Sequence, residues 1–290
     1  MRKLMMRGAM ARSMRLLLCS LSDVASVNIR EALLDLGGWS EAGVHQGQPC
    51  LARGNDLLAT IQEAHLYADH IDALVSRSCG IDIASVVFLS RHKAASGIPT
   101  LTVHPIGNFS KADLGGRPAT LVRAAPDMMT SALRDLLSDA AGLGFQVSFE
   151  VTHHGPYLEA PTMYIEIGSS EDNWGNKEAA RAIATTLISS HHVVAPKAIG
   201  IGGGHYAPRF SEVVATKRIS FGHMIPNHFA DHADDDALRS AVTMALEKSD
   251  GANLAYIHKK SMSRSRATHL RHLVESMGAT AIESSDLEDL

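Results

Sequence analysis

The sequence predicts an α/β fold: a mixed, largely parallel sheet with helices on both faces. Short runs of β-branched and aliphatic residues alternate with segments of helical spacing along most of the 290 residues, and this alternation is typical of such sheets. The composition agrees, because 45% of the residues are hydrophobic and only 20% are charged, which suffices for a large core. No internal repeat or low-complexity linker divides the chain, so we expect a single catalytic domain over residues 14–280.

Each element follows from its local residues. The first strand, over 15–20, precedes a helix in "VNIREALLDLG" that Gly37 stops. Asp127 is expected to cap a helix over 128–141 that closes at the glycines just beyond it. Further strands are expected at 85–90, 100–104, 146–151, 163–168, 197–202, 218–225 and 253–258. Further helices are expected at 176–190, 233–248 and 264–277.

Four segments fall outside this pattern. Residues 1–13 are basic and rich in Met, and we interpret them as a disordered extension rather than a targeting peptide, because "LLLCSL" is too short for a secretory core. Segments 38–84 and 105–126 are less regular and resemble insertions. Residues 281–290 form an acidic tail that we expect to be mobile.

Composition narrows the partners and the compartment. The net charge of −4 gives no overall basic field, so a nucleic-acid contact would need a local patch and DNA is not expected as a partner. The three cysteines are far apart and form no CxxC pair, which suits a reducing compartment, the cytoplasm. No apolar run approaches the roughly 20 residues that span a bilayer, so no membrane contact is expected.

Polar side chains recur where the expected strands end. Ligands of open α/β sheets bind outside the carboxyl ends of the strands, so six strand ends are predicted to point toward one rim. The residues at these ends are Arg91 and His92, His104 with Asn108 beyond it, His153 and His154, Glu171 and Asp172, Gly202 to His205, and His223.

A single histidine at a strand end is more often a cap or a surface residue than a catalyst. Adjacent strand residues also face opposite sides, so only one of His153 and His154 would enter the cleft unless the strand has already ended. The Gly155-Pro156 turn favours such an early end. The recurrence over several strands favours the functional interpretation.

The stretch "GIGGGHYAP" is the most specific local signal. Gly202, Gly203 and Gly204 let backbone N–H groups approach a ligand, so they are candidates for a phosphate cradle or an oxyanion hole. The stretch lacks the GK[ST] of a Walker loop and the spacing of a dinucleotide fingerprint. A flexible turn is the alternative.

Histidine and carboxylate side chains together suit zinc. The set His153, His154 and His205 is the expected ligand group, although no HExxH spacing supports it. "HADDD", over 232–236, fits the acidic first turn of a helix better than a ligand set.

Several motifs in the same order resemble the archaeal and plant type of D-aminoacyl-tRNA deacylase. They are "CSLSDVASVNIREALL", "FLSRHKAASGIPTLTVHPIGNF", "EVTHHGP", "EIGSSEDNWGN", "GIGGGHYAPRF" and "ISFGHMIPNH", and the resemblance covers about residues 14–277. It implies a fold similar to peptidyl-tRNA hydrolases and phosphorylase-like hydrolases. It also implies chiral proofreading, the hydrolysis of the ester between a D-amino acid and the 3′ end of tRNA, and a zinc site. The chain departs from the pattern at 1–13 and around 228–236.

Ester hydrolysis needs an activated water and a place for the oxyanion. His154 is the first choice for general base or metal ligand, with His205 and His104 next. Glu150 and Glu171 are candidates to orient an imidazole or hold the α-amino group of the substrate. His92 and Asn108 are expected to contact the substrate. No GxSxG elbow exists, yet Ser169 and Ser170 follow a glycine, so a covalent route stays open.

Other function classes remain open in the sequence. A nucleoside phosphorylase or a zinc peptidase-like hydrolase would act on a small molecule and would need no positive surface at the mouth of its cleft. A non-catalytic RNA-binding protein would need aromatic stacking platforms, which the 5% aromatic content disfavours. Lys259, Lys260 and Arg264 lie in the basic segment "HKKSMSRSRATHLRH" and are expected to contact the tRNA backbone, with a solvated helix face as the alternative.

Overall fold

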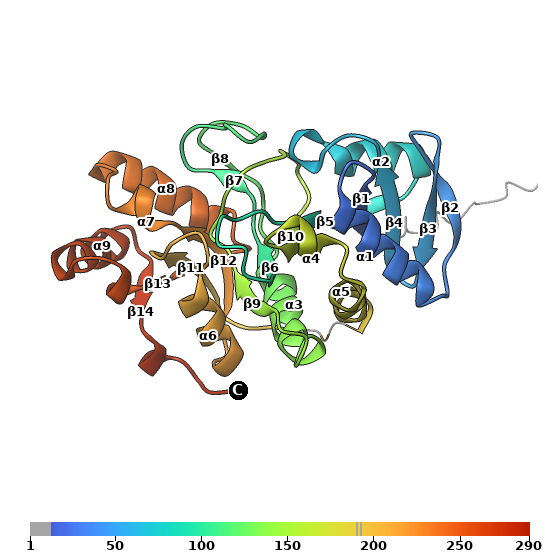
Figure 1. Ribbon diagram of the computed structural model, residues 1–290. Helices are drawn as coiled ribbons and strands as arrows, with labels where there is room; N and C mark the ends of the chain where they lie inside the picture. Colours follow the sequence, from blue (N-terminus) through green and yellow to red (C-terminus); the bar gives the residue numbers. More distant parts are fainter. Residues whose placement is uncertain (1–12, 190, 192) are drawn as a thin grey trace, which may run out of the picture.

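Two β-sheets lie side by side in the computed structural model, which describes residues 13–189, 191 and 193–290 (Figure 1). The strands are β1 (Ser13–Ser20), β2 (Ser40–His45), β3 (Gln48–Arg53), β4 (Asp56–Ile61), β5 (Asp82–Arg91), β6 (Thr100–His104), β7 (Gly107–Asn108), β8 (Thr120–Leu121), β9 (Gln146–Phe149), β10 (Thr162–Gly168), β11 (Lys197–Ile201), β12 (Ser220–Ile225), β13 (Leu254–Ile257) and β14 (Thr280–Ile282). The α-helices are α1 (Val24–Asp35), α2 (Ile71–Cys79), α3 (Pro126–Asp139), α4 (Glu171–Trp174), α5 (Lys177–Ser189), α6 (Pro208–Thr216), α7 (Asn227–Ala230), α8 (Asp235–Glu247) and α9 (Arg264–Ser276). Short 3-10 turns are η1 (His65–Tyr67), η2 (Lys259–Ser261) and η3 (Ser284–Asp286).

The larger sheet has the strand order β2-β3-β4-β1-β5-β10-β6-β9, and the smaller sheet has the order β12-β11-β13-β14. The smaller sheet pairs in parallel throughout. In the larger sheet β1 pairs in parallel with β4 and β5, whereas β6 runs antiparallel to β10. This mixed, largely parallel arrangement confirms the predicted fold class, although the sequence analysis expected one sheet rather than two.

Alternating burial on β1 explains why helices cover both faces of the larger sheet. Leu17 and Cys19 face a core shared with α1, α3 and α5, while Leu16 and Leu18 face the core beneath α2. Successive strand side chains point to opposite faces, so an unbroken apolar run such as "LLLC" is what a strand covered on both faces requires.

The smaller sheet is covered on both faces in the same way. Helices α8 and α9 pack on one face together with Ile199, Ile201 and Ala255. Helix α6 packs on the other face, where Phe210 meets Phe221 with 5.0 Å between ring centroids. Helix α3 also contacts β12, so it lies between the two sheets and helps to join them (Figure 1).

A short segment after β9 ties the two sheets together. The N–H of Val151 donates to the carbonyl of His205 at 3.0 Å, and the N–H of Thr152 donates to the carbonyl of Met224 at 3.0 Å. Glu150 and Tyr206 form an isolated antiparallel bridge. Residues that follow β9, β11 and β12 therefore converge at this junction.

Most predicted elements are present, and three expectations need correction. Asp127 does not cap α3: the helix begins at Pro126, and the carboxylate accepts from Lys197 at 2.8 Å and from Ser220 at 2.7 Å. Segment 38–84 is regular, because it holds the antiparallel meander β2-β3-β4 and helix α2. Segment 105–126 contributes the small ribbon of β7 and β8.

The ends of the chain differ in what the structure describes. The acidic tail packs against the body instead of hanging free: the Arg218 N–H donates to the Glu288 carbonyl at 2.8 Å, and Lys217 pairs with Asp289 at 2.5 Å. Acidic residues of the tail, Glu288 and Asp289, therefore pair with the basic residues Arg218 and Lys217 of the body. The predicted extension 1–13 lies outside the described residues except for Ser13, which opens β1.

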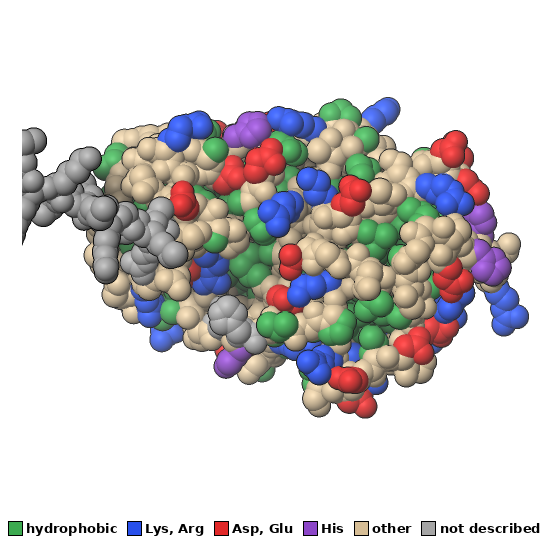
Figure 2. All heavy atoms as spheres, turned by 180° about the vertical axis from the view of Figure 1, so that it is seen from behind, with side chains coloured by type: hydrophobic (Ala, Val, Ile, Leu, Met, Phe, Trp, Pro, Cys, Tyr) green, Lys and Arg blue, Asp and Glu red, His purple; other side chains and the backbone are tan. Residues whose placement is uncertain are grey.

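Acidic and basic side chains are interspersed on the face turned away from the viewer of Figure 1, and neither sign gathers into one large patch there (Figure 2). Across residues 13–189, 191 and 193–290, no helix combines the length and the apolar character needed to span a bilayer.

His223 on β12 holds three segments together as a neutral imidazole. Its Nε2 donates to the Val122 carbonyl at 2.8 Å, and its Nδ1 accepts from the Thr152 hydroxyl at 3.1 Å. The same hydroxyl accepts from the Met224 N–H at 2.9 Å. Burial lowers the pKa of His223 to about 4, because a charged imidazole is poorly solvated there. His223, which the sequence analysis assigned to one of the six strand ends, lies within β12 and therefore has a structural role.

We expect His223 to make the protein less stable in acid. Its pKa is below the ordinary 6.5, so the unfolded chain binds a proton that the folded chain does not. The free energy of unfolding should therefore fall by roughly 3 kcal/mol as the pH drops from 6.5 to 4. His223→Gln keeps the donor to Val122 but does not titrate, so its stability should fall less steeply over this window in urea titrations. An exposed control, His191→Gln, should keep the wild-type slope, and an equally steep slope in His223→Gln would contradict the assignment.

Candidate functional site

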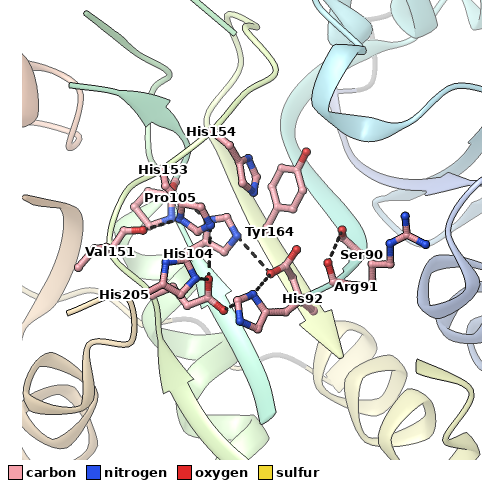
Figure 3. A network of polar contacts seen from close by, with 12 residues as sticks. Ser90, Arg91, His92, His104, Pro105, Val151, His153, His154, Tyr164 and His205 are labelled. Carbon is pink, nitrogen blue, oxygen red and sulfur yellow. Dashed lines mark hydrogen bonds and ion pairs between the residues drawn. The ribbon is translucent and has the colours of Figure 1, made fainter. Parts of the chain in front are cut away.

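A cavity of about 270 Å³ opens at the junction of the two sheets, on the face of the larger sheet that α2 covers. Residues from seven separate segments line it, and Figure 3 shows the network of polar contacts among the histidines at its centre. The lining residues include His92 after β5, His153 and His154 after β9, Tyr164 and Glu166 on β10, and His205 after β11.

Two buried carboxylates form the base of the site. Glu150 is 0% exposed and Glu166 is 3% exposed. His92 Nδ1 lies 3.2 Å from Glu150 and 3.6 Å from Glu166. His104 Nε2 lies 3.5 Å from Glu166, and His205 Nε2 lies 2.9 Å from Glu150. His153 Nε2 reaches Glu150 at 3.5 Å. Every imidazole of this group thus contacts one of the two carboxylates.

The strand register delivers these groups to one face. Tyr164 lies opposite His104, and Glu166 lies opposite both Ser90 and Thr102. Because side chains two residues apart share a face, Glu166 and His104 point to the same side as His92. Gly168 leaves room for His92: a Cβ at this glycine would lie 2.9 Å from the Cβ of His92.

His153 and His154 both line the cavity, although they are adjacent in sequence. Strand β9 ends at Phe149, so the alternation of a strand no longer applies to them. His154 has a φ of +46°, in the left-handed region, which turns the chain before Gly155. The expectation that both histidines enter only if the strand has ended is confirmed.

Three of the imidazoles are fixed in the same tautomer. The Nδ1 atoms of His104, His153 and His154 donate to the carbonyls of Pro105, Val151 and Gly155, at 3.1, 2.8 and 2.7 Å. A carbonyl can only accept, so each Nδ1 carries the proton and, when the ring is neutral, each Nε2 keeps its lone pair. This arrangement is the usual one for histidines that bind metals.

The pKa values divide the site into charged and neutral groups. Burial opposes the charge of Glu166, but hydrogen bonds and positive charge from His104 and His92 outweigh it and hold its pKa well below the ordinary value. Burial likewise opposes ionisation of Glu150, yet its contact with His205 leaves its pKa lowered. For His92 and His104 burial works in the other direction, and the contact with Glu166 raises the pKa of both.

His153 and His154 remain neutral. Burial, together with the charge on His104, lowers the pKa of His153 well below its ordinary value and that of His154 to about 3. A group this weakly basic is a poor proton acceptor at neutral pH but keeps its lone pair available. His154, the first choice for general base, is therefore better suited to be a ligand.

We call the two glutamates and the five histidines of the site the cluster; its members are Glu150, Glu166, His92, His104, His153, His154 and His205. His205 is its most accessible imidazole. Its side chain is 45% exposed, while Glu150 lies fully buried behind it. An exposed imidazole oriented by a buried carboxylate is the arrangement found in general bases. The two oxygens of Glu150 lie at ion-pair distance from three histidines, but none of the contacts has hydrogen-bond alignment, so both oxygens keep lone pairs that can accept a further partner.

Ligand atoms for a metal ion come close together in three overlapping groups. They are His104 with His153 and His154, His92 with Glu150 and His205, and His104 with both glutamates, each within 4.8 Å. The expected set of His153, His154 and His205 is split between two of these groups. The reason is that His205 arrives from the second sheet, on the side of Glu150.

Several predicted site residues lie elsewhere. Glu171 is 77% exposed at the start of α4 and pairs with Lys93 at 3.9 Å. The glycine turn does not form an open cradle, because the Gly202 N–H donates to the Ile225 carbonyl at 2.8 Å and the Gly203 N–H lies 3.1 Å from Asn227 and from Ser261. The turn instead positions the adjacent His205. Ser169 is fully buried, and its hydroxyl donates to the Ile98 carbonyl at 2.8 Å.

The basic segment lies apart from the cluster. Lys259 and Lys260 line a separate hollow beside α6, and Lys259 pairs with Glu283. Arg264 is exposed in the first turn of α9. Glu283 also neutralises Arg271 at 3.0 Å, so acidic residues of the tail offset part of this patch.

Asn108 has a structural role beside a second cavity. Its amide donates to the carbonyls of Gly115 and Arg117, at 3.0 and 3.3 Å, and so fixes the loop between β7 and β8. This loop, together with α7, encloses a groove of about 370 Å³ that shares His153, His154 and His205 with the first cavity.

The sequence analysis missed Glu166, Tyr164 and His65. Glu166 is the single charge within the buried run "MYIEIG", and a lone carboxylate in such a strand is the signal that could have identified it. His65 lies in η1, within segment 38–84, which looked irregular in the sequence, and it lines the cavity. Burial lowers its pKa to about 4.

Comparisons with known proteins agree on one family. The profile of the D-aminoacyl-tRNA deacylase family matches residues 79–282. A Methanococcoides burtonii protein named D-aminoacyl-tRNA deacylase is 39% identical over 94% of this chain and 57% of its own length. A Methanosarcina barkeri protein of the same name is 34% identical over 94% of this chain and 90% of its own length. The chain thus spans little more than half of the first relative and nearly all of the second.

A solved structure shares the whole fold. The crystal structure of a conserved protein of unknown function, AF0625, superposes with a TM-score of 0.84 at 31% identity, covering 95% of this chain and 97% of that one. Both sheets and the junction between them therefore belong to the shared architecture.

Glu166 should matter far more for stability than Glu171. Removing the charge of Glu166 leaves the buried His104 without its ion-pair partner and His92 with Glu150 alone, and breaking a buried ion pair costs about 3–5 kcal/mol. We expect Glu166→Gln to lower the free energy of unfolding by roughly 3 kcal/mol at pH 7 in chelator-treated protein, measured by urea denaturation. The exposed Glu171→Gln should stay within about 0.5 kcal/mol of wild type. Equal losses in the two variants would refute this assignment of the buried charge.

Proposed function

The chain belongs to the D-aminoacyl-tRNA deacylase family, and on that premise we propose that it hydrolyses the ester between a D-amino acid and the terminal ribose of tRNA. The observation that carries the proposal is the exposed His205 imidazole, which lines the first cavity and lies 2.9 Å from the buried Glu150. Hydrolysis of an ester needs a base that activates water, and this pair can supply it.

His205 is the proposed general base, with Glu150 as the residue that orients it. Because Nε2 of His205 faces Glu150, Nδ1 is the nitrogen that takes a proton from water. The water oxygen then bonds to the ester carbon, and a tetrahedral intermediate forms. The ribose oxygen leaves with the electron pair of the broken C–O bond and takes the proton back from His205. The products are the free D-amino acid and tRNA.

A zinc ion is a further part of the proposal. Three observations support the fit: the fixed tautomers of His104, His153 and His154, the neutral state of the latter two, and the unaligned oxygens of Glu150. His104, His153 and His154 would hold the ion. When bound, zinc would polarise the ester carbonyl and make a nearby water more acidic.

The small-molecule alternatives have less support. A nucleoside phosphorylase would need an open phosphate cradle, and the N–H groups of Gly202 and Gly203 are already bonded within the protein. The relatives named above are deacylases rather than phosphorylases or peptidases. We therefore propose aminoacyl-tRNA as the partner and the cytoplasm, where it is made and used, as the location.

Deacylation assays test the proposed reaction and base. The wild-type protein should release D-tyrosine from D-tyrosyl-tRNA and leave L-tyrosyl-tRNA intact. His205→Gln should lower kcat by about 10²–10⁴-fold, the usual contribution of a general base, with KM nearly unchanged. His269→Gln is the matched control, because His269 also pairs with a carboxylate, Asp235 at 2.7 Å, but on the remote helix α9. Intact D-tyrosyl-tRNA after incubation with wild type would reject the function, whereas full kcat in His205→Gln would reject only the base.

Zinc binding has a direct readout. Chelator-treated wild type should bind about one zinc ion per chain in a calorimetric titration, and His104→Ala or His153→Ala should weaken that binding by at least about tenfold, as loss of a ligand group does. The control His269→Gln should titrate like wild type. Unaltered zinc affinity in both cluster variants would show that the ion, if bound, lies elsewhere.

A further inference from the structure

The groove beside the cluster and the first cavity are the two compartments around the same histidines. Both are lined by His153, His154, His205 and Leu114. The groove lies between the β7–β8 loop, residues 109–119, and helix α7. Figure 1 shows the loop above the junction of the two sheets and α7 beside α8. A bond cleaved at the cluster would therefore have one part of the substrate in each compartment.

The two compartments differ in size and lining. The first cavity, of about 270 Å³, is lined by the buried rings of Tyr164 and His65, which lie 6.1 Å apart, and by exposed residues such as Ser22 and Lys93. The groove is larger, at about 370 Å³, and its exposed walls include Ser110, Lys111 and His228. An aminoacyl group is a chain end and needs the smaller space, whereas the nucleotide must continue into the rest of the tRNA and fits the larger groove.

The groove carries an aromatic pair suited to a base. Phe109 and Phe229 lie with ring centroids 5.5 Å apart and planes tilted by 36°. Both rings are half-buried and pack against the core of the smaller sheet, which holds them in place. Nucleobases stack on such rings whatever their sequence. Only 5% of the residues are aromatic, so two phenylalanines together in the groove next to the cluster favour a binding role.

The loop is held at a fixed distance from the cluster. Gly155, next to His154, approaches the loop so closely that a Cβ there would lie 2.1 Å from the Gly116 nitrogen. The Gly155 N–H donates to the Leu114 carbonyl at 3.0 Å. Movement of the β7–β8 loop would therefore disturb His154, and a ligand seated on Phe109 is positioned relative to the imidazoles.

The charge at the rim fits a phosphate. The ammonium group of Lys111 is exposed and, within the described residues, forms no ion pair. A free cation beside an aromatic groove is the combination that binds single-stranded nucleic acid, where bases stack and phosphates meet basic side chains.

On the proposed deacylase function, we propose that this groove binds the terminal adenosine of the tRNA. The adenine stacks against Phe109 and Phe229, and Lys111 meets the phosphate that precedes it. The aminoacyl group then lies in the first cavity over Tyr164, and the ester reaches the histidines that line both compartments.

Binding of adenosine 5′-monophosphate tests the site without the reaction. Calorimetric titration should detect adenosine 5′-monophosphate and the trinucleotide CCA. Phe109→Leu and Phe229→Leu keep apolar volume but lose the stacking face, so each should weaken binding about five-fold to a hundred-fold. Phe145→Leu is the matched control, because Phe145 is also half-buried but lies before β9, away from the groove. Unfolding temperatures of all variants establish that they are folded.

Kinetics separate this assignment from its alternatives. Phe109→Leu should raise KM by the same factor for D-tyrosyl-tRNA and D-alanyl-tRNA, because the adenosine is common to both. A loss confined to D-tyrosyl-tRNA would place the amino acid in the groove and overturn the proposal. Binding of adenosine 5′-monophosphate that is unchanged in both phenylalanine variants would also overturn it, while wild type could still deacylate D-tyrosyl-tRNA. Inactive wild type that binds the nucleotide through these rings would instead reject the deacylase function alone.

Discussion

The buried carboxylates Glu150 and Glu166 are the constraint on which the arrangement of the site depends. A buried ion costs several kcal/mol unless opposite charge and hydrogen bonds compensate it. Glu166 lies on β10 and Glu150 directly follows β9. The imidazoles that compensate them arrive from the ends of β5 and β6, from the segment after β9 and from the turn after β11. His205 comes from the second sheet, so the charge balance of Glu150 requires both sheets to be docked.

This compensation also distributes protons unequally. The contacts with Glu166 favour the charged forms of His92 and His104, and the positive charge on His104 in turn disfavours charge on His153 and His154, whose pKa values are lowered. The result is a set of neutral imidazoles beside a set of charged ones within one cavity. Environments that push the pKa values of neighbouring groups apart are what allow them to take different roles.

The sequence predicted the alternation of strands and helices because covered strands such as β1 consist of unbroken aliphatic runs. It also located most of the histidines, since each directly follows such a run. Glu166 was hidden because it lies inside a strand rather than at its end, and its partners are 62 to 74 residues away in sequence, at His104 and His92. The meander β2-β3-β4 was missed because its first two strands are largely exposed or half-exposed, and Gly43 interrupts the first while Pro49 interrupts the second. The bonded state of the Gly202 and Gly203 N–H groups depends on Ile225, Asn227 and Ser261, which no local pattern connects to the turn.

One antiparallel strand explains which strand-end residues reach the site. If all strands were parallel, Glu171 after β10 would lie beside His92 and His104 at a common edge. Strand β6 instead runs against β10, so its carboxyl end meets the middle of β10, where His104 lies opposite Tyr164. Strand β5 runs with β10 and brings His92 past Glu166 from the other direction. The two imidazoles therefore converge on Glu166 from opposite ends, and the chain beyond Gly168 turns away into α4, which leaves Glu171 in solvent. At this sheet the site therefore lies over the face of β10, an interior strand, rather than beyond the ends of parallel strands.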